Sequence, residues 1–454
     1  MLQTPQKTQS KEKRVKNFQE VCQGFSRSSA LGEARRCPQC SDPVCVNACP
    51  LKVDIPGFIR LLREGDFPAA LQKIKECNAL PDICGRVCGA PCERTCILQK
   101  EGDPIAIRAL ERYAADHGRV LSILKKKRAP SGPPVAVIGS GAAGLATAYY
   151  LARRDFQVTV FESFPFLGGV LRYGIPEIRL PNKIVDMTVA DIEEEGVRFA
   201  TLSRLGQSLT IEDVWARGFR SVVLAVGTGG ADLKQLPGHF LGGVYFSEEF
   251  LMKADVSEPD PALINDALFR RCKKVAVLGA GNKALDCARL CLRLGKDVSL
   301  LFPQAEEEMA VYPADRKHAR EEGVTIVPLV RPLELRGTAD QSVCGVFCDR
   351  MDYADPKGNG QWQLMAVPDS AFVVEADSVI LAMAHKPNMA VFDLVPGLTS
   401  TKQGYLWVEE LTMKTPLPYV YAAGDALCGQ LDLVGTIASA QKAASAVENG
   451  FMKS

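Results

Sequence analysis

The feature that most constrains the fold is an internal duplication of a glycine-rich turn. An apolar run leads into Gly-x-Gly-x-x-Gly at 139–144, and a second apolar run leads into Gly-x-Gly-x-x-Ala at 279–284. Each turn opens a stretch of helical spacing, so both copies have the order strand, turn, helix. This order begins an α/β unit that binds a dinucleotide. The duplication therefore predicts two Rossmann-like domains in one chain.

Two more apolar segments, 221–227 and 378–384, resemble each other and have the composition of buried strands. Each can close one of the two units. A strand expected at 419–423 precedes Gly-Asp and a final helix through 438–447. Because this last strand follows the second unit, we expect the second unit to be inserted into the first.

The first copy carries the fuller signature of a dinucleotide site. Its glycines let the backbone approach a pyrophosphate, whose charge the N-terminus of the following helix stabilises. A second strand at 157–161 leads to Glu162, close to the ~20-residue offset expected of a carboxylate that binds ribose hydroxyls. These features predict an adenine dinucleotide here, against the alternative of a glycine turn with a purely structural role.

The second copy does not reveal which nicotinamide nucleotide it takes. Its second strand, 297–302, ends in Pro303-Gln304. An acidic residue there would favour the 2′-hydroxyl of NAD and an arginine would favour the 2′-phosphate of NADP, but neither is present. Lys283, in the first helical turn, can pair with a phosphate or stand as an ordinary solvated lysine.

Cysteine is concentrated at one end of the chain, where ten of the sixteen lie at or before position 96. The pattern Cys-x2-Cys-x4-Cys-x3-Cys-Pro begins at Cys37, and four more cysteines follow at four-residue steps from Cys84. The first group approaches the bacterial ferredoxin run, with two extra residues before its third cysteine. Zinc is the main rival, since Cys-x2-Cys suits a tetrahedral site. Zinc gives no reason for eight cysteines beside two dinucleotide folds, so the grouping favours iron–sulfur clusters.

Composition and charge disfavour several other classes. A net charge of +1 offers no field for nucleic acid or an anionic membrane surface. No apolar run approaches the ~18 residues of a membrane span. The polar start lacks the apolar core of a signal peptide, so we expect a cytoplasmic protein in which structural disulfides are rare. Neither glycine unit carries the cysteine pair of a disulfide reductase.

The length of 454 residues allows two or three domains. The first part contains two similar helix starts, Asp54-Ile55-Pro56 and Asp66-Phe67-Pro68, each followed by apolar residues at helical spacing. They predict a small helical domain. This domain has too few apolar residues to form a stable core by itself, so we expect bound clusters to hold it together. The expected domains are a helical iron–sulfur domain at 1–124, a linker at 125–134, a first dinucleotide domain at 135–262 and 386–454, and a second at 263–385.

Six longer motifs are specific enough for comparison with a known family. They are CPQC-x4-C-x3-CP, LPDICGRVC, IRALERY, YGIPEIRLP, GAGNKALD and YAAGDA. They resemble the small (beta) subunit of NADPH-dependent glutamate synthase, and the likeness extends from about Val15 to Gly450. The wider family includes the N-terminal part of dihydropyrimidine dehydrogenase and the large subunit of the NADH-dependent ferredoxin:NADP oxidoreductase. The resemblance implies FAD, two 4Fe–4S clusters and NADPH or NADH as cofactors.

The resemblance also implies which side chains hold the clusters. The ligands of one cluster would be Cys37, Cys40, Cys45 and Cys96, and those of the other would be Cys49, Cys88, Cys92 and Glu111. Ligation is thus crossed between the two cysteine groups. Cys84 is left over and is not a ligand by the same comparison. Without the resemblance, Glu111 would be interpreted as a solvated helix carboxylate.

The nucleotide sites are implied in the same way. For FAD the residues are Gly139, Gly141, Ala142, Ala143, Gly144, Glu162, Gly169, Arg179, Gly424, Asp425 and Thr436. For the nicotinamide nucleotide they are Gly279, Ala280, Gly281, Asn282, Lys283, Pro303, Gln304 and Ala384. No catalytic acid or base is assigned, because hydride transfer is the chemistry of the cofactors.

Three departures from the family pattern bear on these expectations. The family usually has an arginine pair in place of Pro303-Gln304 and a glycine in place of Ala384. The loop between Cys88 and Cys92 is also shorter than usual. The first two departures concern the nicotinamide nucleotide, and the third concerns the geometry of the second cluster.

The expected function is electron input. NAD(P)H would reduce FAD, and electrons would leave through the clusters to a partner, in this family a large catalytic subunit. One alternative is a related reductase subunit that feeds ferredoxin, a dihydropyrimidine dehydrogenase partner or a sulfur acceptor. Another is a non-enzymatic electron-relay adaptor that has lost nicotinamide binding through the changes at 303–304 and 384.

Overall fold

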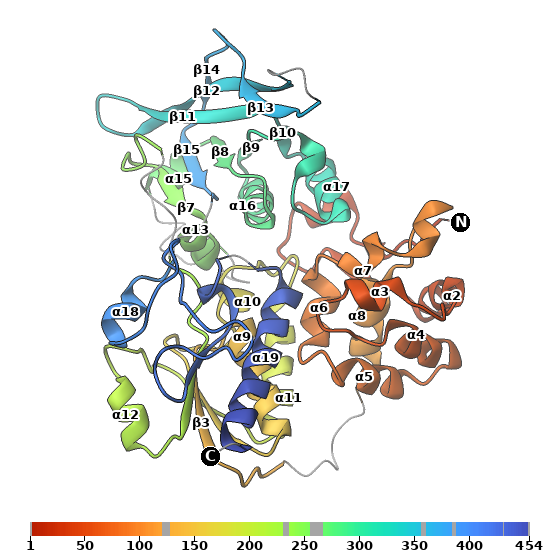
Figure 1. Ribbon diagram of the computed structural model, residues 1–454. Helices are drawn as coiled ribbons and strands as arrows, with labels where there is room; N and C mark the ends of the chain where they lie inside the picture. The colour runs from red at the N-terminus through yellow and green to blue at the C-terminus, as the bar shows by residue number, and fades with distance from the viewer. Residues whose placement is uncertain are drawn as a thin grey trace.

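The computed structural model shows a helical unit beside two α/β units (Figure 1). The helical unit is drawn in red and orange, and the two α/β units lie one above the other next to it. The residues described by the structure are 2–119, 128–229, 236–254, 267–355, 360–383, 387–429 and 431–452.

The helical unit forms the N-terminal part of the chain. Its elements are β1 (Lys7–Thr8), α1 (Lys11–Arg14), β2 (Cys22–Gly24), α2 (Arg27–Arg36), α3 (Val44–Ala48), α4 (Ile55–Glu64), α5 (Phe67–Lys75), α6 (Pro81–Val87), α7 (Pro91–Arg94), η1 (Ile97–Lys100) and α8 (Ile107–His117). Both predicted helix starts are confirmed. The side chain of Asp54 accepts the N–H of Gly57 at 3.0 Å, and that of Asp66 accepts the N–H of Ala69 at 3.0 Å. The predicted helical domain is not entirely helical, because β1 and β2 pair antiparallel near its start.

The first α/β unit is built on a five-stranded parallel sheet with the order β16-β6-β3-β4-β5. Its strands are β3 (Pro134–Ile138), β4 (Gln157–Phe161), β5 (Arg198–Ala200), β6 (Ser221–Leu224) and β16 (Val420–Ala422). Its helices are α9 (Ala142–Arg153), α10 (Val170–Tyr173), α11 (Asn182–Glu194), α12 (Ile211–Ala216), α18 (Ala390–Leu394), η4 (Gly424–Ala426) and α19 (Leu433–Met452). β16 follows the second unit in sequence and yet pairs with β6 of the first, Val420 opposite Val222.

The second α/β unit has a five-stranded parallel sheet with the order β10-β9-β8-β15-β7. Its elements are β7 (Val244–Phe246), α13 (Ser247–Ala254), α15 (Ala267–Arg271), β8 (Lys274–Leu278), α16 (Asn282–Arg293), β9 (Asp297–Leu301), η3 (Glu306–Glu308), α17 (Pro313–Glu322), β10 (Thr325–Val327) and β15 (Ser378–Leu381). β7 pairs with β15 although its residues fall in the range 135–262 that we assigned to the first domain. A strand of three residues carries too short a pattern to be assigned to one sheet from sequence.

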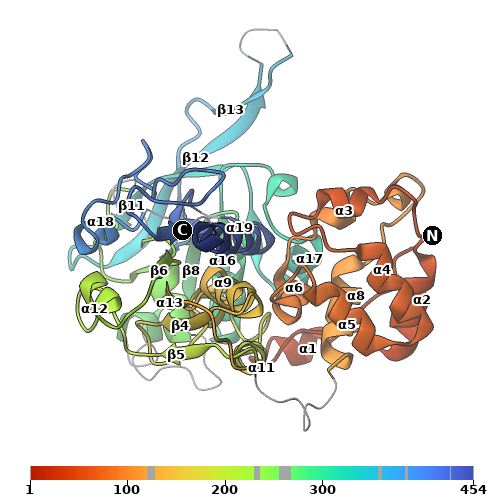
Figure 2. The ribbon, with the colours of Figure 1, turned by 60° about the horizontal axis from the view of Figure 1, so that its bottom comes forward.

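An antiparallel sheet is added to the second unit between β10 and β15. Its strands are β11 (Val330–Gly337), β12 (Val343–Ala354), β13 (Gln363–Ala366) and β14 (Phe372–Glu375), and β12 pairs with the other three. The arm formed by β12 and β13 projects away from the rest of the molecule (Figure 2). Within the described ranges, every helix is too short or too polar to cross a lipid bilayer.

The helical unit shares its hydrophobic core with the first α/β unit. Buried side chains such as Phe58 and Ile83 are continuous with those of α9, including Tyr150. The hydroxyl of Tyr150 donates to the carbonyl oxygen of Cys77 at 2.6 Å and accepts the N–H of Ala79 at 3.3 Å. The helical unit therefore packs directly against α9 of the first α/β unit.

Candidate cofactor-binding sites

The first cysteine set lies where short helices end. Cys37 follows α2, Cys45 lies in α3, and Cys96 stands between α7 and η1. α3 packs against α7, which brings the two cysteine groups together. Burial, followed by the charges of Cys37 and Cys96, raises the pKa of the Cys45 thiol to about 11. Burial also raises the pKa of Cys37, with smaller contributions from Cys40 and Cys96, so these four cysteines are neighbours in space.

The second set meets between α3, α6, α7 and α8. Cys49 follows α3, Cys88 follows α6, Cys92 lies in α7, and Glu111 lies in α8. Burial raises the pKa of Cys92, and the charges of Glu93, Cys88, Glu111 and Cys49 add to it. Burial raises the pKa of Glu111 to about 7. The structure thus places Glu111, a partly buried residue, among three cysteines.

Tight turns aim backbone N–H groups at these sulfurs. Gln39, Lys52 and Ala90 follow cysteines by two or three positions and have φ of 56°, 55° and 49°. Such left-handed conformations are uncommon for residues other than glycine. The turn at Ala90 brings its N–H to 3.3 Å from Cys88 Sγ. Since no glycine occupies the left-handed position of these turns, the sequence offered no signal for them.

The arrangement of the side chains differs from that of a single-ion site. In the part of the chain that the structure describes, no group of three His, Cys, Asp or Glu side chains is placed to hold one metal ion. In a 4Fe–4S cluster the four protein ligands bind four different iron atoms, so they stand farther apart than the ligands of one ion.

The first glycine turn is too tight for side chains at two of its positions. A Cβ on Gly144 would lie 1.8 Å from the carbonyl oxygen of Gly139, and Gly139 itself has a φ of 105°. In contrast, a Cβ on Gly141 would meet no described atom within 4 Å. Gly141 caps the twelve-residue helix α9 without a side-chain hydrogen bond, which leaves N–H groups of the first turn available to an anion.

Distant segments gather around this turn. The carboxylate of Glu162 accepts the backbone N–H of Ser140 at 2.9 Å and its hydroxyl at 2.5 Å. A Cβ on Gly169 would lie 2.8 Å from the Cα of Gly141, so this second loop reaches the turn closely. The structure therefore brings these predicted residues to the N-terminus of α9.

The C-terminal segment approaches the same helix. A Cβ on Gly424 would lie 2.7 Å from the Cβ of Ala143, within the same first turn of α9 as Ala142. Asp425 accepts a hydrogen bond from the hydroxyl of Thr436 at 3.1 Å, and burial raises the pKa of its carboxyl group. These residues of the predicted FAD site also lie together.

The second glycine turn repeats the geometry of the first. Gly279 has a φ of 143°, and a Cβ there would lie 2.4 Å from the carbonyl oxygen of Ala382. Ala280 and Gly281 follow, and Gly281 caps α16. The buried Oδ1 of Asn282 has no hydrogen-bond partner among the described residues.

Lys283 is not the solvated lysine that was one of its two expected roles. Its ammonium group pairs with the carboxylate of Glu248 in α13 at 2.5 Å, and its side chain is 14% exposed. An ammonium group held in this way is not a solvated surface lysine. The loop that carries Ala384 lies outside the described residues.

The loop after β9 has no positively charged residue at 303 or 304, but two arginine side chains of α17 reach the segment that follows it. Pro303 is partly buried and Gln304 is exposed. Arg316 donates to the carbonyl oxygen of Glu306 at 2.5 Å, and Arg320 donates to its carboxylate at 2.8 Å. Both guanidinium groups are therefore bound to Glu306, the first residue of η3 and two positions after Gln304.

Arg179 lies between the two α/β units. Its guanidinium group pairs with Asp286 of α16 at 2.5 Å and approaches Asp315 of α17 at 3.8 Å. Burial raises the pKa of Asp286 to about 6 although Arg179 opposes the shift. The contact that the structure shows for Arg179 therefore joins the first unit to the second.

Two families match the chain. Residues 14–122 match dihydropyrimidine dehydrogenase domain II, 4Fe-4S cluster, and residues 133–446 match pyridine nucleotide-disulphide oxidoreductase. The glutamate synthase [NADPH] small chain of Mycobacterium tuberculosis is 34% identical, and the alignment covers 97% of this chain and 92% of that one. The chain belongs to the glutamate synthase small-chain family. Its two domains are of the kinds that carry an iron–sulfur cluster, a flavin and NAD(P)H.

Other relatives of this small-chain family have different names. The NADP(+)-dependent formate dehydrogenase subunit beta of Moorella thermoacetica and the NADPH-Fe(3+) oxidoreductase subunit beta of Geobacter sulfurreducens are each 31% identical over 89% of this chain. The chain spans 59% and 63% of their respective lengths. Among solved structures, Mycobacterium tuberculosis FprA in complex with NADPH matches with a TM-score of 0.58 at 18% identity, over 71% of this chain and 85% of that one. This last likeness shows the fold of the two α/β units.

One contact within this chain joins the helical iron–sulfur domain to the start of α17. It was not predicted from the sequence. The guanidinium carbon of Arg108 stands 3.5 Å from the centre of the Tyr312 ring. Arg108 also donates to the carbonyl oxygen of Cys88 at 3.0 Å, and the hydroxyl of Tyr312 donates to Glu93 at 3.1 Å. The segment that carries Cys88 and Cys92 is therefore bound directly to the second α/β unit. No local pattern connects residues so far apart in the chain.

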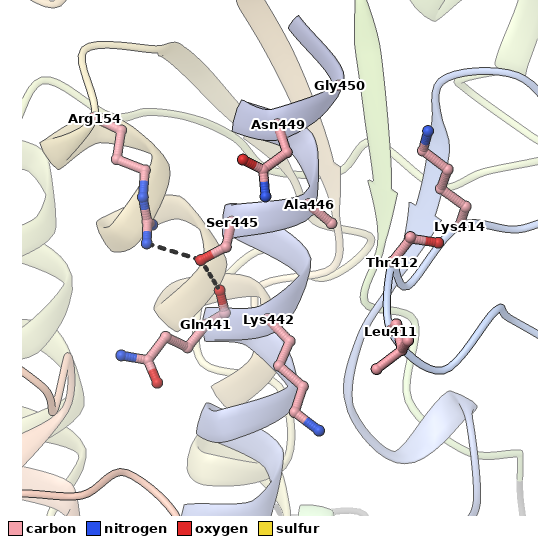
Figure 3. A pocket seen from close by; sticks show the side chains of 10 residues that line it. All are labelled: Arg154, Leu411, Thr412, Lys414, Gln441, Lys442, Ser445, Ala446, Asn449 and Gly450. Carbon is pink, nitrogen blue, oxygen red and sulfur yellow. Dashed lines mark hydrogen bonds between the residues drawn. The ribbon is translucent and has the colours of Figure 1, made fainter. Parts of the chain in front are cut away.

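A separate cavity of about 370 Å³ lies at the other end of α9 (Figure 3). Its lining residues are Arg154, Leu411, Thr412, Lys414, Gln441, Lys442, Ser445, Ala446, Asn449 and Gly450. Arg154 follows the last residue of α9 and donates to Ser445 at 3.0 Å. Because twelve helical residues span about 18 Å, this cavity is remote from the glycine turn.

Proposed function

We propose that the chain is the electron-input subunit of a larger oxidoreductase, which oxidises NAD(P)H and passes electrons through two 4Fe–4S clusters to a partner. FAD, when bound, supplies the chemistry that converts a hydride into single electrons. The observation that carries the proposal is the convergence of two cysteine sets in a domain whose core is continuous with the first dinucleotide unit. The unit that would hold FAD therefore packs directly against the domain that would hold the clusters.

The two sets fit the proposed clusters in number and kind. Cys37, Cys40, Cys45 and Cys96 would hold one cluster, and Cys49, Cys88, Cys92 and Glu111 would hold the other. The N–H group of Ala90 supports the fit, because hydrogen bonds to cluster sulfurs stabilise the thiolate and tune the potential. The desolvated thiols would be deprotonated on binding iron.

The first glycine turn fits FAD. Gly139, Gly144 and Gly169 have no room for a side chain, and the open space at Gly141 would receive the pyrophosphate. Glu162 lies within hydrogen-bonding distance of that turn, at the position of a ribose-binding acid. We also propose that Arg179 lies near the bound flavin, in addition to its ion pair with Asp286.

The second turn fits the nicotinamide nucleotide. The unpartnered Oδ1 of Asn282 is a buried acceptor that a bound nucleotide can satisfy. We infer that the loop at Pro303-Gln304 sets the preference between NADH and NADPH, because it stands at the end of β9 where the ribose is read. The pairing of β16 with β6 supports the inference that the second α/β unit is inserted into the first. Because β7 pairs with β15, we infer that the second unit starts before residue 262.

The partner is proposed to be the glutamate synthase large subunit or another protein acceptor. The names of the formate dehydrogenase and Fe(3+) oxidoreductase relatives favour a second candidate, in which the same input module serves a different acceptor. The protein that co-purifies with the chain separates these two functions.

Anaerobic mixing of the purified protein with NADH and then with NADPH tests the proposal. We expect one nucleotide or both to bleach the flavin absorbance, followed by the EPR signal of reduced clusters. If neither nucleotide bleached the flavin, the electron-input function would be overturned and the adaptor alternative supported. A colourless preparation without iron would overturn the cluster assignment separately.

A further inference from the structure

The second cluster site contains one more possible ligand than a cluster needs. Cys84 lies in α6, one helical turn before Cys88, and is fully buried. α6 packs closely on α8, since a Cβ on Gly85 would lie 2.5 Å from the Cα of Arg112 (Figure 1). The thiol of Cys84 and the carboxylate of Glu111 both lie beside the side chain of Asn78, between these helices. A thiol and a carboxylate are therefore both available as the fourth ligand.

Both candidates contact the side chain of Asn78. The Nδ2 group of Asn78 donates to Oε1 of Glu111 at 2.7 Å, and the thiol of Cys84 donates to Oδ1 of Asn78 at 3.7 Å. Asn78 is 1% exposed. Its backbone N–H donates to the carbonyl oxygen of Ile74 at 2.9 Å, which anchors it to the end of α5.

The orientation of the Asn78 amide is determined by a third contact. The backbone N–H of Leu80 lies 2.9 Å from Oδ1. A backbone N–H can only donate, so the oxygen of the amide must face Leu80 and Cys84. The NH₂ group must then face Glu111. Asn78 therefore offers a donor to the carboxylate and an acceptor to the thiol, and the reverse assignment would lose two hydrogen bonds.

This orientation has opposite consequences for the two candidates. Glu111 accepts a hydrogen bond on Oε1, while Oε2 has no hydrogen-bond partner among the described residues. A carboxylate held by one oxygen presents the other in a defined direction. Cys84 uses its S–H bond as a donor, and a protonated thiol is not a metal ligand.

We propose that Asn78 is a positioning residue that selects Glu111 rather than Cys84 as the fourth ligand of the second cluster. The inference rests on the ligand set proposed above. Without the amide donor, Cys84 would replace Glu111 by ligand exchange. The Fe–O bond would break, an Fe–S bond would form, and the thiol proton would pass to the released carboxylate, with no change in the oxidation state of iron.

Four variants of the full chain test the selection, with iron content and the EPR spectrum of the reduced protein as readouts. Asn78→Asp keeps the shape and the acceptor of the side chain but removes the donor to Glu111. We expect it to retain iron and to change the EPR signal of the second cluster. Cys84→Ala alone should leave iron and spectrum as in the wild type. The double variant should lose the second cluster, from about eight iron atoms per chain to about four.

Two results would overturn the inference: a wild-type EPR signal in Asn78→Asp, or loss of the second cluster in Cys84→Ala alone. If Asn78→Asp does not fold, Asn78→Ser removes the same donor and should change the EPR signal in the same way. Glu111→Ala is the fourth variant and tests the ligand assignment itself. Unchanged iron and spectrum in that variant would refute the carboxylate ligand whatever Asn78 does.

Discussion

Replacing Glu322 with glutamine should weaken the attachment of the N-terminal segment to the second α/β unit. The carboxylate of Glu322, at the end of α17, pairs with Arg14 at 3.1 Å, Arg289 at 2.7 Å and Arg293 at 2.9 Å. Its side chain and that of Arg293 are fully buried. Removing the negative charge leaves the fully buried guanidinium group of Arg293 without its carboxylate partner, and breaking such a buried pair costs about 3–5 kcal/mol.

The pKa of Glu322 leads to a similar magnitude. Burial opposes ionisation, but the hydrogen bonds and charges of Arg289 and Arg293 lower the pKa from 4.5 to about 2. Since a tenfold change in proton affinity is worth about 1.4 kcal/mol, the ionised carboxylate contributes about 3 kcal/mol to stability. A pKa that is lower in the folded state stabilises the fold above pH 4.5, and this contribution disappears as the pH falls toward 2.

The assay is urea denaturation of wild type, Glu322→Gln and the control Glu321→Gln at pH 7 and at pH 3. Glu321 pairs with the same Arg14 at 2.6 Å but is 41% exposed, so its replacement should cost less than about 1 kcal/mol. At pH 7 the loss of unfolding free energy in Glu322→Gln should be several times larger than the loss in Glu321→Gln. At pH 3 the loss in Glu322→Gln should be smaller than at pH 7. Equal losses in the two variants, or a loss in Glu322→Gln independent of pH, would refute the reasoning.

Three further predictions concern the cofactor sites. Gly144→Ala should abolish flavin binding because its Cβ would lie 1.8 Å from a carbonyl oxygen, whereas Gly141→Ala should fold normally and only weaken flavin affinity; equal flavin content in both would contradict this. Cys96→Ala should lower the iron content by about half, and unchanged iron would exclude crossed ligation. Replacing Pro303 and Gln304 with arginine should raise the ratio of kcat/KM for NADPH over NADH by about tenfold or more, and an unchanged ratio would remove this loop from nucleotide choice.

Features encoded within a short stretch of chain could be predicted from the sequence. The helix starts at Asp54 and Asp66 are confirmed, because an N-cap depends only on the few residues around it. The glycine turns at 139–144 and 279–284 likewise begin α9 and α16, since a tight strand-to-helix turn restricts its own residues. The spacing of the cysteines indicated metal chemistry for the same local reason.

Contacts between distant segments were decided by the tertiary structure. Glu111 had the pattern of a solvated helix residue, and only the packing of α8 on α6 places it among Cys49, Cys88 and Cys92. The resemblance to a family supplied that assignment in advance, but composition and periodicity did not. The same holds for Arg108 on Tyr312, because neither residue carries a local pattern that names its partner.

The sequence by itself therefore determined the kinds of unit in this protein: two dinucleotide turns and a cysteine-rich helical segment, each written in a few neighbouring residues. The tertiary structure decided how those units meet. It assigned β7 to the second sheet and β16 to the first, and it oriented Asn78 between a carboxylate and a thiol. The physical reason is that backbone geometry follows from neighbouring residues, whereas side chains far apart in sequence are brought together only by burial of the surfaces between them.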